Sequence, residues 1–478
     1  MGVSANSRMF GMLSKGEGNM NRQNNNLAVD EFEDVHSEVE ATAMPMWKSR
    51  ELSSVLVEDV SRGPGVDKPF LYMTILLMAV GLIMVLSASF VSASYMTGEP
   101  LRFFIRQLIF AVSGIAIMLV ISRISIRTIS RFSTTILFVS LVLLVCVLLF
   151  GIRINGAYRW LGFGGENTSL SFQPSEITKL GLILAFSKMI CKFGQKKMRT
   201  LRYGVLPFAA IIAVIAILLV RQPHISAAII ISATGVILMF AGGTKLRYFI
   251  AAALAGVLLV GAVIFPGVIN AAREGDMDGV VASAESPDLN FSRFGHWGRR
   301  IDIWLNPDAD PLGGGFQTRQ SLNAVGSGGM LGQGLGQSRQ KHQYLPEEHN
   351  DFIFAIIGEE LGFVGSMLIL GLFALLIIRG YWLALYAKDR YSALVAIGIT
   401  SMLALQVFLN VAVVTNLIPA TGIALPLFSY GGTALWIQLA MMGIVLSVSR
   451  EIPVSKEEEI EDEELELEPD VKEPEYLL

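Results

Sequence analysis

The chain has 478 residues, of which 53% are hydrophobic and 16% are charged, and its mean hydropathy is +0.55. Soluble globular domains usually carry about 25% charged residues. This composition therefore disfavours an ordinary soluble enzyme, a disordered chain and a nucleic-acid-binding protein. The net charge of −4 is unevenly distributed, because residues 1–69 carry −4 and residues 451–478 carry −11, which leaves +11 for residues 70–450.

The two ends of the chain are predicted to be polar tails. Residues 1–69 contain scattered charges and no charged start followed by a short apolar stretch and a cleavage site, so a cleaved signal peptide is not expected. The acidic residues 451–478 predict a solvated tail. That tail serves either solubility and spacing or the docking of a cytoplasmic partner.

The middle of the chain contains apolar runs of about 20 residues, the length that an α-helix needs to cross a bilayer. The runs are continuous rather than alternating, so helices are favoured over the strands of a barrel. They lie at 70–95, 104–122, 129–151, 175–191, 204–220, 225–242, 247–267, 352–378, 391–415 and 424–449. The predicted fold class is an all-α polytopic membrane protein of about ten transmembrane helices, with residues 70–450 as its membrane domain.

Basic residues in the short connections predict the orientation. If the N-terminus is cytoplasmic, the inner connections hold 13 basic residues, whereas the outer ones hold only Arg102, Arg153, Arg159 and Arg221, with Arg106 at a helix start. Both termini are therefore expected in the cytoplasm. The long segment 268–350, between helices seven and eight, becomes a large extracytoplasmic loop.

The loop is rich in glycine. Residues 311–336 contain nine glycines, which we consider too many for a helix, so an irregular segment is expected. Its backbone amides could approach and hold an anion such as phosphate. The alternative is a loop in which the glycines serve turns alone. No motif for binding ATP or NAD is present.

Polar side chains also gather near the predicted outer helix ends. Glu359 and Glu360 lie inside an apolar run, and such groups usually face a cavity or pair with a partner; a direct catalytic role is the alternative. Glu176 and Lys179 are neighbours on one helical face. Either they form a simple ion pair, or Lys179, like Arg159, is a cation for an anionic substrate. Prolines and glycines in residues 415–433 break a helix, as in segments that line cavities.

The chain resembles the FtsW/RodA family of bacterial shape, elongation, division and sporulation proteins over about residues 67–450. The resemblance lies in specific motifs, in the expected order. They are Gly81 to Ser89, Asp310-Pro311 to Gly315-Phe316-Gln317, Gly332-Gln333-Gly334-Leu335-Gly336, Leu345-Pro346-Glu347, Asp351-Phe352-Ile353-Phe354, Gly358-Glu359-Glu360-Leu361-Gly362, and Pro426 to Ser429-Tyr430-Gly431-Gly432.

The resemblance implies a ten-helix peptidoglycan glycosyltransferase that polymerises lipid II on the outer face of the bacterial cytoplasmic membrane. It implies a class B penicillin-binding protein as the cross-linking partner, together with other division proteins at the septum. The amino-acid sequence of the first helix favours the division branch. The family's essential aspartate is matched to Asp310. One departure is His224, which stands where the family often has Asp.

The implied transfer needs a base for the acceptor hydroxyl and positive charge at the departing diphosphate. Asp310 is the expected general base, and Arg159, Lys179 and Lys341 are the expected cations. Gln317, Ser321, Glu347 and His349 are further candidates for substrate binding. No cofactor is required by the sequence, although a divalent cation, Mg²⁺ or Mn²⁺, is a candidate at the diphosphate.

Two functions of other classes remain open. A lipid II flippase would also have many helices, broken segments and buried charges. It would, however, need polar groups along a path through both leaflets, whereas this sequence concentrates them at the outer side. A scaffold that recruits division proteins through its tails would have no need for Asp310.

Overall fold

The computed structural model describes residues 65–154, 157–162, 171–254, 300, 303–305, 314–342 and 344–452. Of the predicted tails, only 65–69 and 451–452 fall within this part of the chain. Asp310 and most of the loop before it lie outside the described residues.

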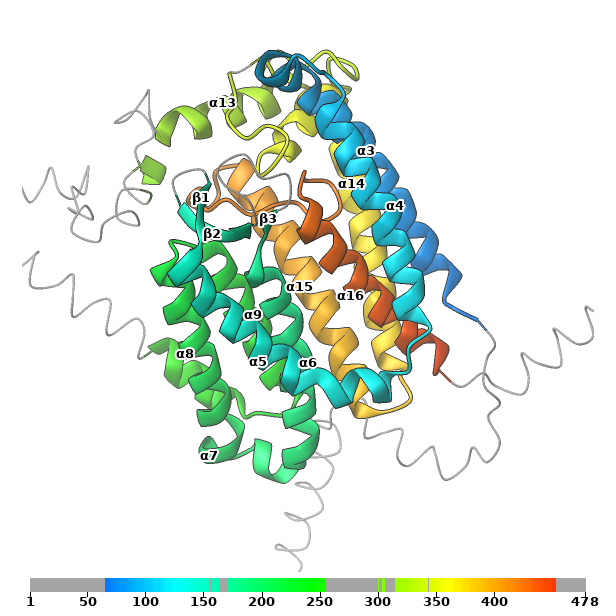
Figure 1. Cartoon of the computed structure of the whole chain (residues 1–478), viewed down its shortest axis with the longest axis vertical. Coiled ribbons are helices and arrows are strands. Elements are labelled where there is room, and N and C mark those ends of the chain that lie inside the picture. The colour runs from blue at the N-terminus through cyan, green and yellow to red at the C-terminus, as the bar shows by residue number, and fades with distance from the viewer. Residues whose placement is uncertain are drawn as a thin grey trace, which may run out of the picture. The chain divides into compact units, whose positions relative to one another are not determined.

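Helices make up most of the described chain (Figure 1). They are α3 Lys68–Thr97, α4 Arg102–Ser122, α5 Ile126–Phe150, α6 Pro174–Met198, α7 Leu201–Gly204, α8 Leu206–Arg221, α9 Ile225–Ala241, α13 Gly314–Ser327, α14 Ile353–Leu385, α15 Arg390–Val414 and α16 Gly432–Arg450. Within the described residues, seven spans are long and apolar enough to cross a membrane, with α7 and α8 counted together, and α9 is apolar but shorter. The predicted polytopic helical fold is confirmed. The count of ten stays a prediction, because α6 is not among the seven spans, α9 is short, and the run 247–267 is described only to residue 254.

Glycines let neighbouring helices approach closely. The helices α4 and α16 lie side by side (Figure 1), and a Cβ added to Gly443 would lie 2.6 Å from the backbone oxygen of Met118. Between α5 and α6, a Cβ at Gly181 would lie 3.0 Å from the Cα of Leu137. Close backbone approach at small residues is a main source of helix association in lipid.

One end of the bundle is tied by polar groups. Asp67 caps α3 by accepting a hydrogen bond from the amide of Phe70, and its carboxylate also pairs with Arg379 near the end of α14. The amide of Asp67 donates to Ser449 Oγ in the last turn of α16, at 3.1 Å. This end therefore holds the start of α3 and the ends of α14 and α16, which the sequence assigns to the cytoplasmic side.

A small antiparallel sheet at the opposite end was not predicted. Its strands are β1 Ile152–Ile154, β2 Ala157–Gly162 and β3 Ser171–Phe172, in the order β1-β2-β3. Ile154 pairs with Ala157, and the sequence between them is Asn-Gly, the dipeptide most typical of a tight hairpin. The sheet lies at the same end of the bundle as α13 (Figure 1).

The glycine-rich segment contains a helix, contrary to our expectation. α13 occupies Gly314–Ser327, and its glycines lie at its two ends, so the ten residues between Gly315 and Gly326 form an uninterrupted helical stretch. The number of glycines was therefore misleading, because their positions decide whether a helix can form. Among the described residues of this segment, irregular backbone follows α13, where Gly329, Gly332, Gly334 and Gly336 have positive φ.

The segment 328–336 repairs a break in α14. Gly362 has φ 68° and ψ −168°, which interrupts the helix. The amides of Phe363 and Val364 donate instead to the carbonyls of Gly329 and Met330, at 2.9 and 3.0 Å. In return, the carbonyls of Glu359 and Glu360 accept from the amides of Gln333 and Gly334, both at 3.0 Å. The backbone groups that a helix break would leave unpaired in a membrane are thereby satisfied.

Glu359 and Glu360 have the pairing role that the sequence allowed. Both are buried. Glu360 accepts hydrogen bonds from Ser87 and Lys341, and Glu359 accepts from Ser338 and from the amide of Arg339. These contacts fix residues 336–341 against α14 and α3.

The last predicted helix, 424–449, begins later than expected. Residues 416–431 are irregular, and α16 starts at Gly432. Pro426 and Leu427, which has φ 64°, prevent a continuous helix here. The break that the sequence predicted in 415–433 is confirmed. It extends over residues 424–431 of the predicted run.

Candidate active site

A cavity of about 680 Å³ opens where several helix ends meet. It is lined by the starts of α4, α6 and α9, by β2, by the residues before α14, and by the broken segment between α15 and α16. All of these lie at the end of the bundle opposite the Asp67–Arg379 pair. The volume lies within the range of small-molecule sites.

Arginine and lysine side chains reach the cavity from four segments: Arg106 of α4, Arg159 of β2, Lys179 of α6 and Arg300. Arg159 of β2 lines it and donates a hydrogen bond to the carbonyl of Pro223. Arg300 donates to the carbonyl of Ala420. Burial lowers the pKa of both guanidinium groups, and the charge of Arg300 lowers that of Arg159 further. Two like charges held in one partly desolvated cavity favour an anionic ligand.

Lys179 and Glu176 form a buried ion pair at the start of α6. Lys179 Nζ lies 2.7 Å from Glu176 Oε1, and the side chains are 5% and 8% exposed. The predicted i,i+3 contact is confirmed, and because it is buried it is not the wet, weak pair of the simpler interpretation. Glu176 Oε2 is buried and has no hydrogen-bond partner among the described residues. The pair is thus incompletely satisfied and faces the cavity.

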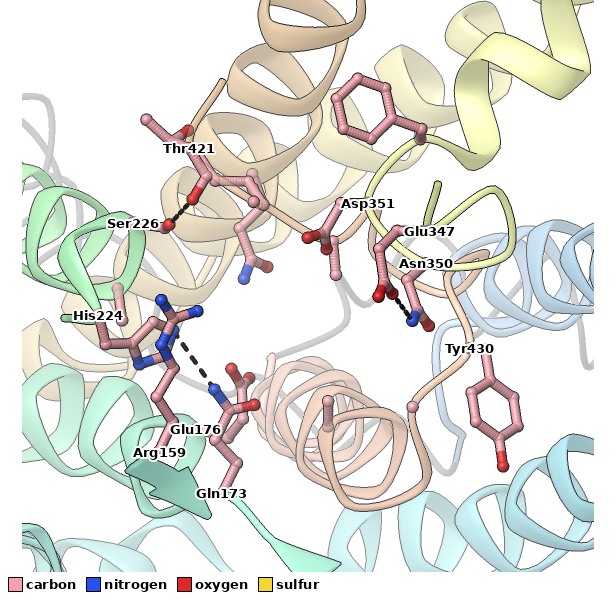
Figure 2. Close-up of a pocket in the computed structure, with 18 of the residues that line it drawn as sticks. Arg159, Gln173, Glu176, His224, Ser226, Glu347, Asn350, Asp351, Thr421 and Tyr430 are labelled. Carbon is pink, nitrogen blue, oxygen red and sulfur yellow. Dashed lines mark hydrogen bonds between the residues drawn. The ribbon is translucent and has the colours of Figure 1, made fainter. Parts of the chain in front are cut away.

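Asp351 is the carboxylate that the structure brings to the cationic groups. It precedes α14 and lines the cavity, with Arg159 and Arg300 close enough to act on it electrostatically. Burial raises the pKa of Asp351 to about 6; Glu347 raises it too, and the two arginines partly oppose the shift. Figure 2 shows Asp351 and Glu347 on one side of the cavity and Arg159 and His224 on the other.

The backbone leaves room for this carboxylate at Gly422. A Cβ at that position would lie 3.0 Å from Asp351 Oδ2, and Gly422 has φ +68°. Only glycine allows both the close approach of the carboxylate and the positive φ at low cost.

His224, which departs from the family pattern, lines the cavity as an uncharged side chain. Burial, together with the charges of Arg159 and Lys179, lowers its pKa to about 3. Its Nε2 lies 3.3 Å from Gln173 Nε2. At neutral pH the imidazole therefore offers a ligand a hydrogen bond and no positive charge.

Most of the predicted site residues lie at or beside the cavity. Arg159, Lys179, Gln317 and Glu347 line the cavity. His349 lies beside it, with its ring stacked on Phe103 at a centroid distance of 4.9 Å.

Ser321 and Lys341 do not line this cavity. Ser321 is buried and donates to the carbonyl of Val414, at 2.8 Å. Lys341 is buried 3.1 Å from Glu360, which already neutralises it. Asp310 lies outside the described residues, although Trp304 and Gln317, on either side of it in the sequence, both line the cavity.

The sequence alone predicted no role for Asp351, although Asp351 begins one of the family motifs. The available signal was a carboxylate placed directly before an apolar helix, in a segment with other ionisable groups. Position alone could not distinguish a helix-start charge, which is common and favourable, from a group that points into a cavity.

Several uncharged polar atoms of the cavity also lack partners among the described residues. They are Gln406 Oε1, Thr421 Oγ1 and Thr433 Oγ1. Buried polar atoms are normally satisfied, so these atoms are suited to hydrogen-bond a polar ligand. A ligand with both anionic and hydroxyl groups would match the cationic side chains and these polar atoms.

The chain is similar to proteins of bacterial wall synthesis over most of its length. It is 41% identical to stage V sporulation protein E of Bacillus subtilis over 386 residues, which cover 80% of this chain and 97% of that protein. It is 40% identical to a probable peptidoglycan glycosyltransferase FtsW of Trichlorobacter lovleyi over 385 residues, 80% of this chain and 93% of that protein.

Solved structures show the same arrangement. A chain from a peptidoglycan synthase complex, studied for its coordination of polymerization and crosslinking, is 28% identical with a TM-score of 0.63, over 81% of this chain and 98% of its own length. The rod shape determining protein RodA of Thermus thermophilus is 25% identical with a TM-score of 0.56, over 82% and 99%. Residues 68–453 also match the family of cell cycle proteins that comprises FtsW, RodA and SpoVE. With a polytopic helical fold, a charged cavity at one end of the bundle and this match over most of the chain, the protein belongs to the FtsW/RodA/SpoVE family.

Proposed function

We propose that this protein is a peptidoglycan glycosyltransferase that polymerises lipid II on the outer face of the cytoplasmic membrane. The observation that carries the proposal is a single cavity in which the carboxylate of Asp351 faces the cations Arg159 and Arg300. Relatives named as probable peptidoglycan glycosyltransferases support it. So does the likeness to a peptidoglycan synthase complex.

The reaction joins an acceptor sugar hydroxyl to the anomeric carbon of a diphosphate-linked donor. The base takes the hydroxyl proton, the new C–O bond forms, and the bond to the diphosphate breaks. The leaving group departs as the lipid diphosphate, whose negative charge is met by Arg159, Arg300 and Lys179. This inverting transfer needs one carboxylate base, and the cationic groups take the place of an acid.

Asp310 is the proposed base, because the resemblance matches it to the family's essential aspartate and the segment that contains it is flanked by the cavity residues Trp304 and Gln317. Asp351 is the alternative base. It lines the cavity, and its pKa, which burial raises to about 6, leaves it ionised at neutral pH yet basic enough to accept a proton.

A divalent cation fits the cavity only in part. Among the described residues no group of three His, Cys, Asp or Glu side chains gathers as in a metal site built by protein alone. Mg²⁺, however, is often held by one or two carboxylates together with substrate phosphates. Glu347 and Asp351 line the cavity and would be those carboxylates. The ion would neutralise charge on the diphosphate.

A flippase is less well supported. The polar residues collect at one end of the bundle, and the interior between α6, α9 and α15 is filled by Leu182, Ile183 and Leu238, each less than 1% exposed. A Cβ at Gly398 would already meet Ile183 at 2.6 Å and Leu238 at 3.1 Å. A path for a polar head group through both leaflets would require this packing to open.

We propose a class B penicillin-binding protein as the partner, with other division proteins and a septal location. The amino-acid sequence of the first helix supports the division branch. The 41% identity to a sporulation protein favours a sporulation role as the alternative. The decisive experiment is polymerisation of labelled lipid II by the purified full-length chain, with and without its transpeptidase. Glycan strands that form under neither condition would contradict the proposal.

The proposed orientation can be tested by cysteine labelling. Glu285→Cys is expected to react with an impermeant thiol reagent on intact cells, whereas Leu465→Cys reacts only after permeabilisation. The reason is the excess of basic residues in the connections that would be cytoplasmic. The reverse labelling pattern would invert the proposed topology and place the cavity in the cytoplasm.

Arg159→Ala is expected to weaken binding of lipid II. The loss of one charge-assisted contact, about 1.5–3 kcal/mol, corresponds to a rise in KM of about 10- to 100-fold. Arg221→Ala is the matched control, because Arg221 is an exposed arginine at the same end of the bundle that does not line the cavity. Equal KM values for the two variants would show that Arg159 has no special contact with substrate.

Lys179→Ala is also expected to reduce polymerisation, but it leaves Glu176 buried without its partner. Loss of folded protein should therefore accompany the loss of activity, and this variant is to be compared at equal amounts of folded protein.

A further inference from the structure

One wall of the cavity is formed by uncharged side chains from two helices and from the broken segment after α15. We call it the neutral wall, and it comprises Ser226, Ala227 and Ile230 of α9, Gln406 of α15, and Thr421 and Ile423. All six residues are buried. Figure 2 shows Thr421 and Ser226 together on one side of the cavity, away from Tyr430. The wall thus offers a ligand hydrogen bonds and apolar contacts rather than charge.

The part of the neutral wall that follows α15 is held by both helices. Ser226 Oγ of α9 donates to the carbonyl of Thr421. Asn410 Nδ2 of α15 donates to the carbonyl of Ile423, at 2.6 Å. Gln406 lies four residues before Asn410, so it is on the same face of α15 and about 6 Å farther along the helix axis, toward the interior of the bundle. The wall is therefore fixed before a ligand binds.

Two side chains of the neutral wall have polar atoms with no hydrogen-bond partner among the described residues. They are Gln406 Oε1 and Thr421 Oγ1, and the two residues are only 3% and 9% exposed. A buried polar atom normally has a partner, and leaving one unpaired is costly. The cost applies strongly to Gln406, which lies within a membrane-spanning helix. Unpaired atoms on the wall of a cavity are suited to bind a ligand.

The chemistry of the neutral wall matches an amide with a small apolar end. Gln406 Oε1 is an acceptor for an N–H group, and the hydroxyl of Thr421 can donate to a carbonyl oxygen. Ala227, Ile230 and Ile423 supply apolar surface in the same wall. An acetamido group has the three matching parts, which are an N–H group, a carbonyl oxygen and a methyl group.

The neighbouring charges indicate which part of the substrate carries that group. Arg159 donates to the carbonyl of Pro223, two residues before α9 begins, so a diphosphate at Arg159 lies next to the neutral wall. In a 2-acetamido sugar diphosphate, the acetamido group and the diphosphate are on adjacent carbons. Beside Gly422, the carboxylate of Asp351 disfavours the diphosphate itself. The uncharged part of the sugar is therefore expected at the neutral wall.

We propose that Gln406 and Thr421 form a subsite that recognises the 2-acetamido group of the sugar that carries the diphosphate of lipid II. Gln406 accepts from the amide N–H, Thr421 donates to the carbonyl oxygen, and the methyl group packs against Ile230. The subsite selects the substrate and takes no part in proton transfer. The inference rests on the proposed function, because it takes lipid II as the substrate.

The main test compares lipid II with an analogue in which a hydroxyl replaces that acetamido group. Two hydrogen bonds and a methyl contact should make kcat/KM of the wild type about 10- to 100-fold higher for lipid II. Gln406→Leu keeps nearly the same side-chain volume and should lower this selectivity ratio about tenfold. Its kcat/KM for the analogue should stay within about threefold of the wild type. Equal losses on both substrates, with an unchanged ratio, would overturn the proposal.

The second residue of the subsite gives an independent test. Thr421→Val keeps the shape and removes the hydroxyl, so it should lower the selectivity ratio about three- to tenfold. Thr421→Ser keeps the hydroxyl and should keep the ratio. If Gln406→Leu does not fold, an unchanged ratio in Thr421→Val overturns the proposal.

Gln222→Leu is the matched control for general damage. Gln222 is a buried glutamine at the same end of the bundle, and its Nε2 donates to the carbonyl of Leu144, at 2.8 Å. It does not line the cavity. Whatever its effect on the amount of folded protein, its selectivity ratio should equal that of the wild type. A ratio as low as in Gln406→Leu would show damage rather than recognition and would overturn the proposal.

Binding without turnover separates this inference from the proposed function. The Kd of the purified full-length chain is measured for lipid II and for the analogue. A preference for lipid II of about tenfold or more that is lost in Gln406→Leu supports the subsite even if no glycan strands form, and then only the proposed function fails. Polymerisation by a wild type that shows equal kcat/KM and equal Kd for both substrates would keep the proposed function and overturn the subsite.

Discussion

Asp310→Asn is expected to reduce lipid II polymerisation by about 10²–10⁴-fold while the protein still folds and enters the membrane. Asn keeps nearly the same shape as Asp, but its amide cannot accept the proton of a sugar hydroxyl. The measurement is the initial rate on labelled lipid II with purified protein and its partner. A wild-type rate would remove Asp310 from the mechanism.

The pH dependence distinguishes Asp351 from Asp310. A base must be ionised, and the pKa of Asp351 is raised to about 6, so with Asp351 as the base the wild-type rate should be half-maximal near pH 6 and level off at higher pH. Below that pH the carboxylate is protonated and the rate is lost.

Asp351→Asn is the matched variant, with the same change of charge and shape at the alternative base. If Asp351 is the base, Asp310→Asn keeps the rise near pH 6, whatever its absolute rate. If the rise persists in Asp351→Asn and disappears in Asp310→Asn, the base is Asp310.

Gly332→Ala is expected to prevent stable folding. A Cβ at this position would lie 2.1 Å from the backbone oxygen of Glu360, inside the contact that repairs the break in α14. Because the obstacle is backbone, no side chain can move aside, and we expect a loss above about 4 kcal/mol. The measurement is the yield of folded protein and its thermal unfolding in detergent.

Gly336→Ala is the control, because Gly336 has nearly the same φ, +81° against +80°, but nothing within 4 Å of an added Cβ. It should show only the strain of a left-handed residue, about 1–2 kcal/mol. Equal losses in the two variants would mean that backbone strain, rather than the approach of 328–336 to α14, makes glycine necessary at 332.

The sequence by itself determined the membrane class, most helix positions and the family. Hydrophobic length is a local property, so runs such as 104–122 and 391–415 matched α4 and α15 to within two residues. The contact between Glu176 and Lys179 followed from helical spacing alone. Family motifs are likewise read directly from the order of residues.

Only the tertiary structure decided which polar groups share a cavity. Arg159, Lys179 and Asp351 are far apart in the sequence, and they meet because helix ends from distant segments gather at one end of the bundle. The same packing pairs Lys341 with Glu360 and keeps it out of the cavity, although its charge alone made it equal to Arg159 as a candidate. Which partner neutralises a charge depends on contacts across the fold, and residue type and local spacing do not contain that information.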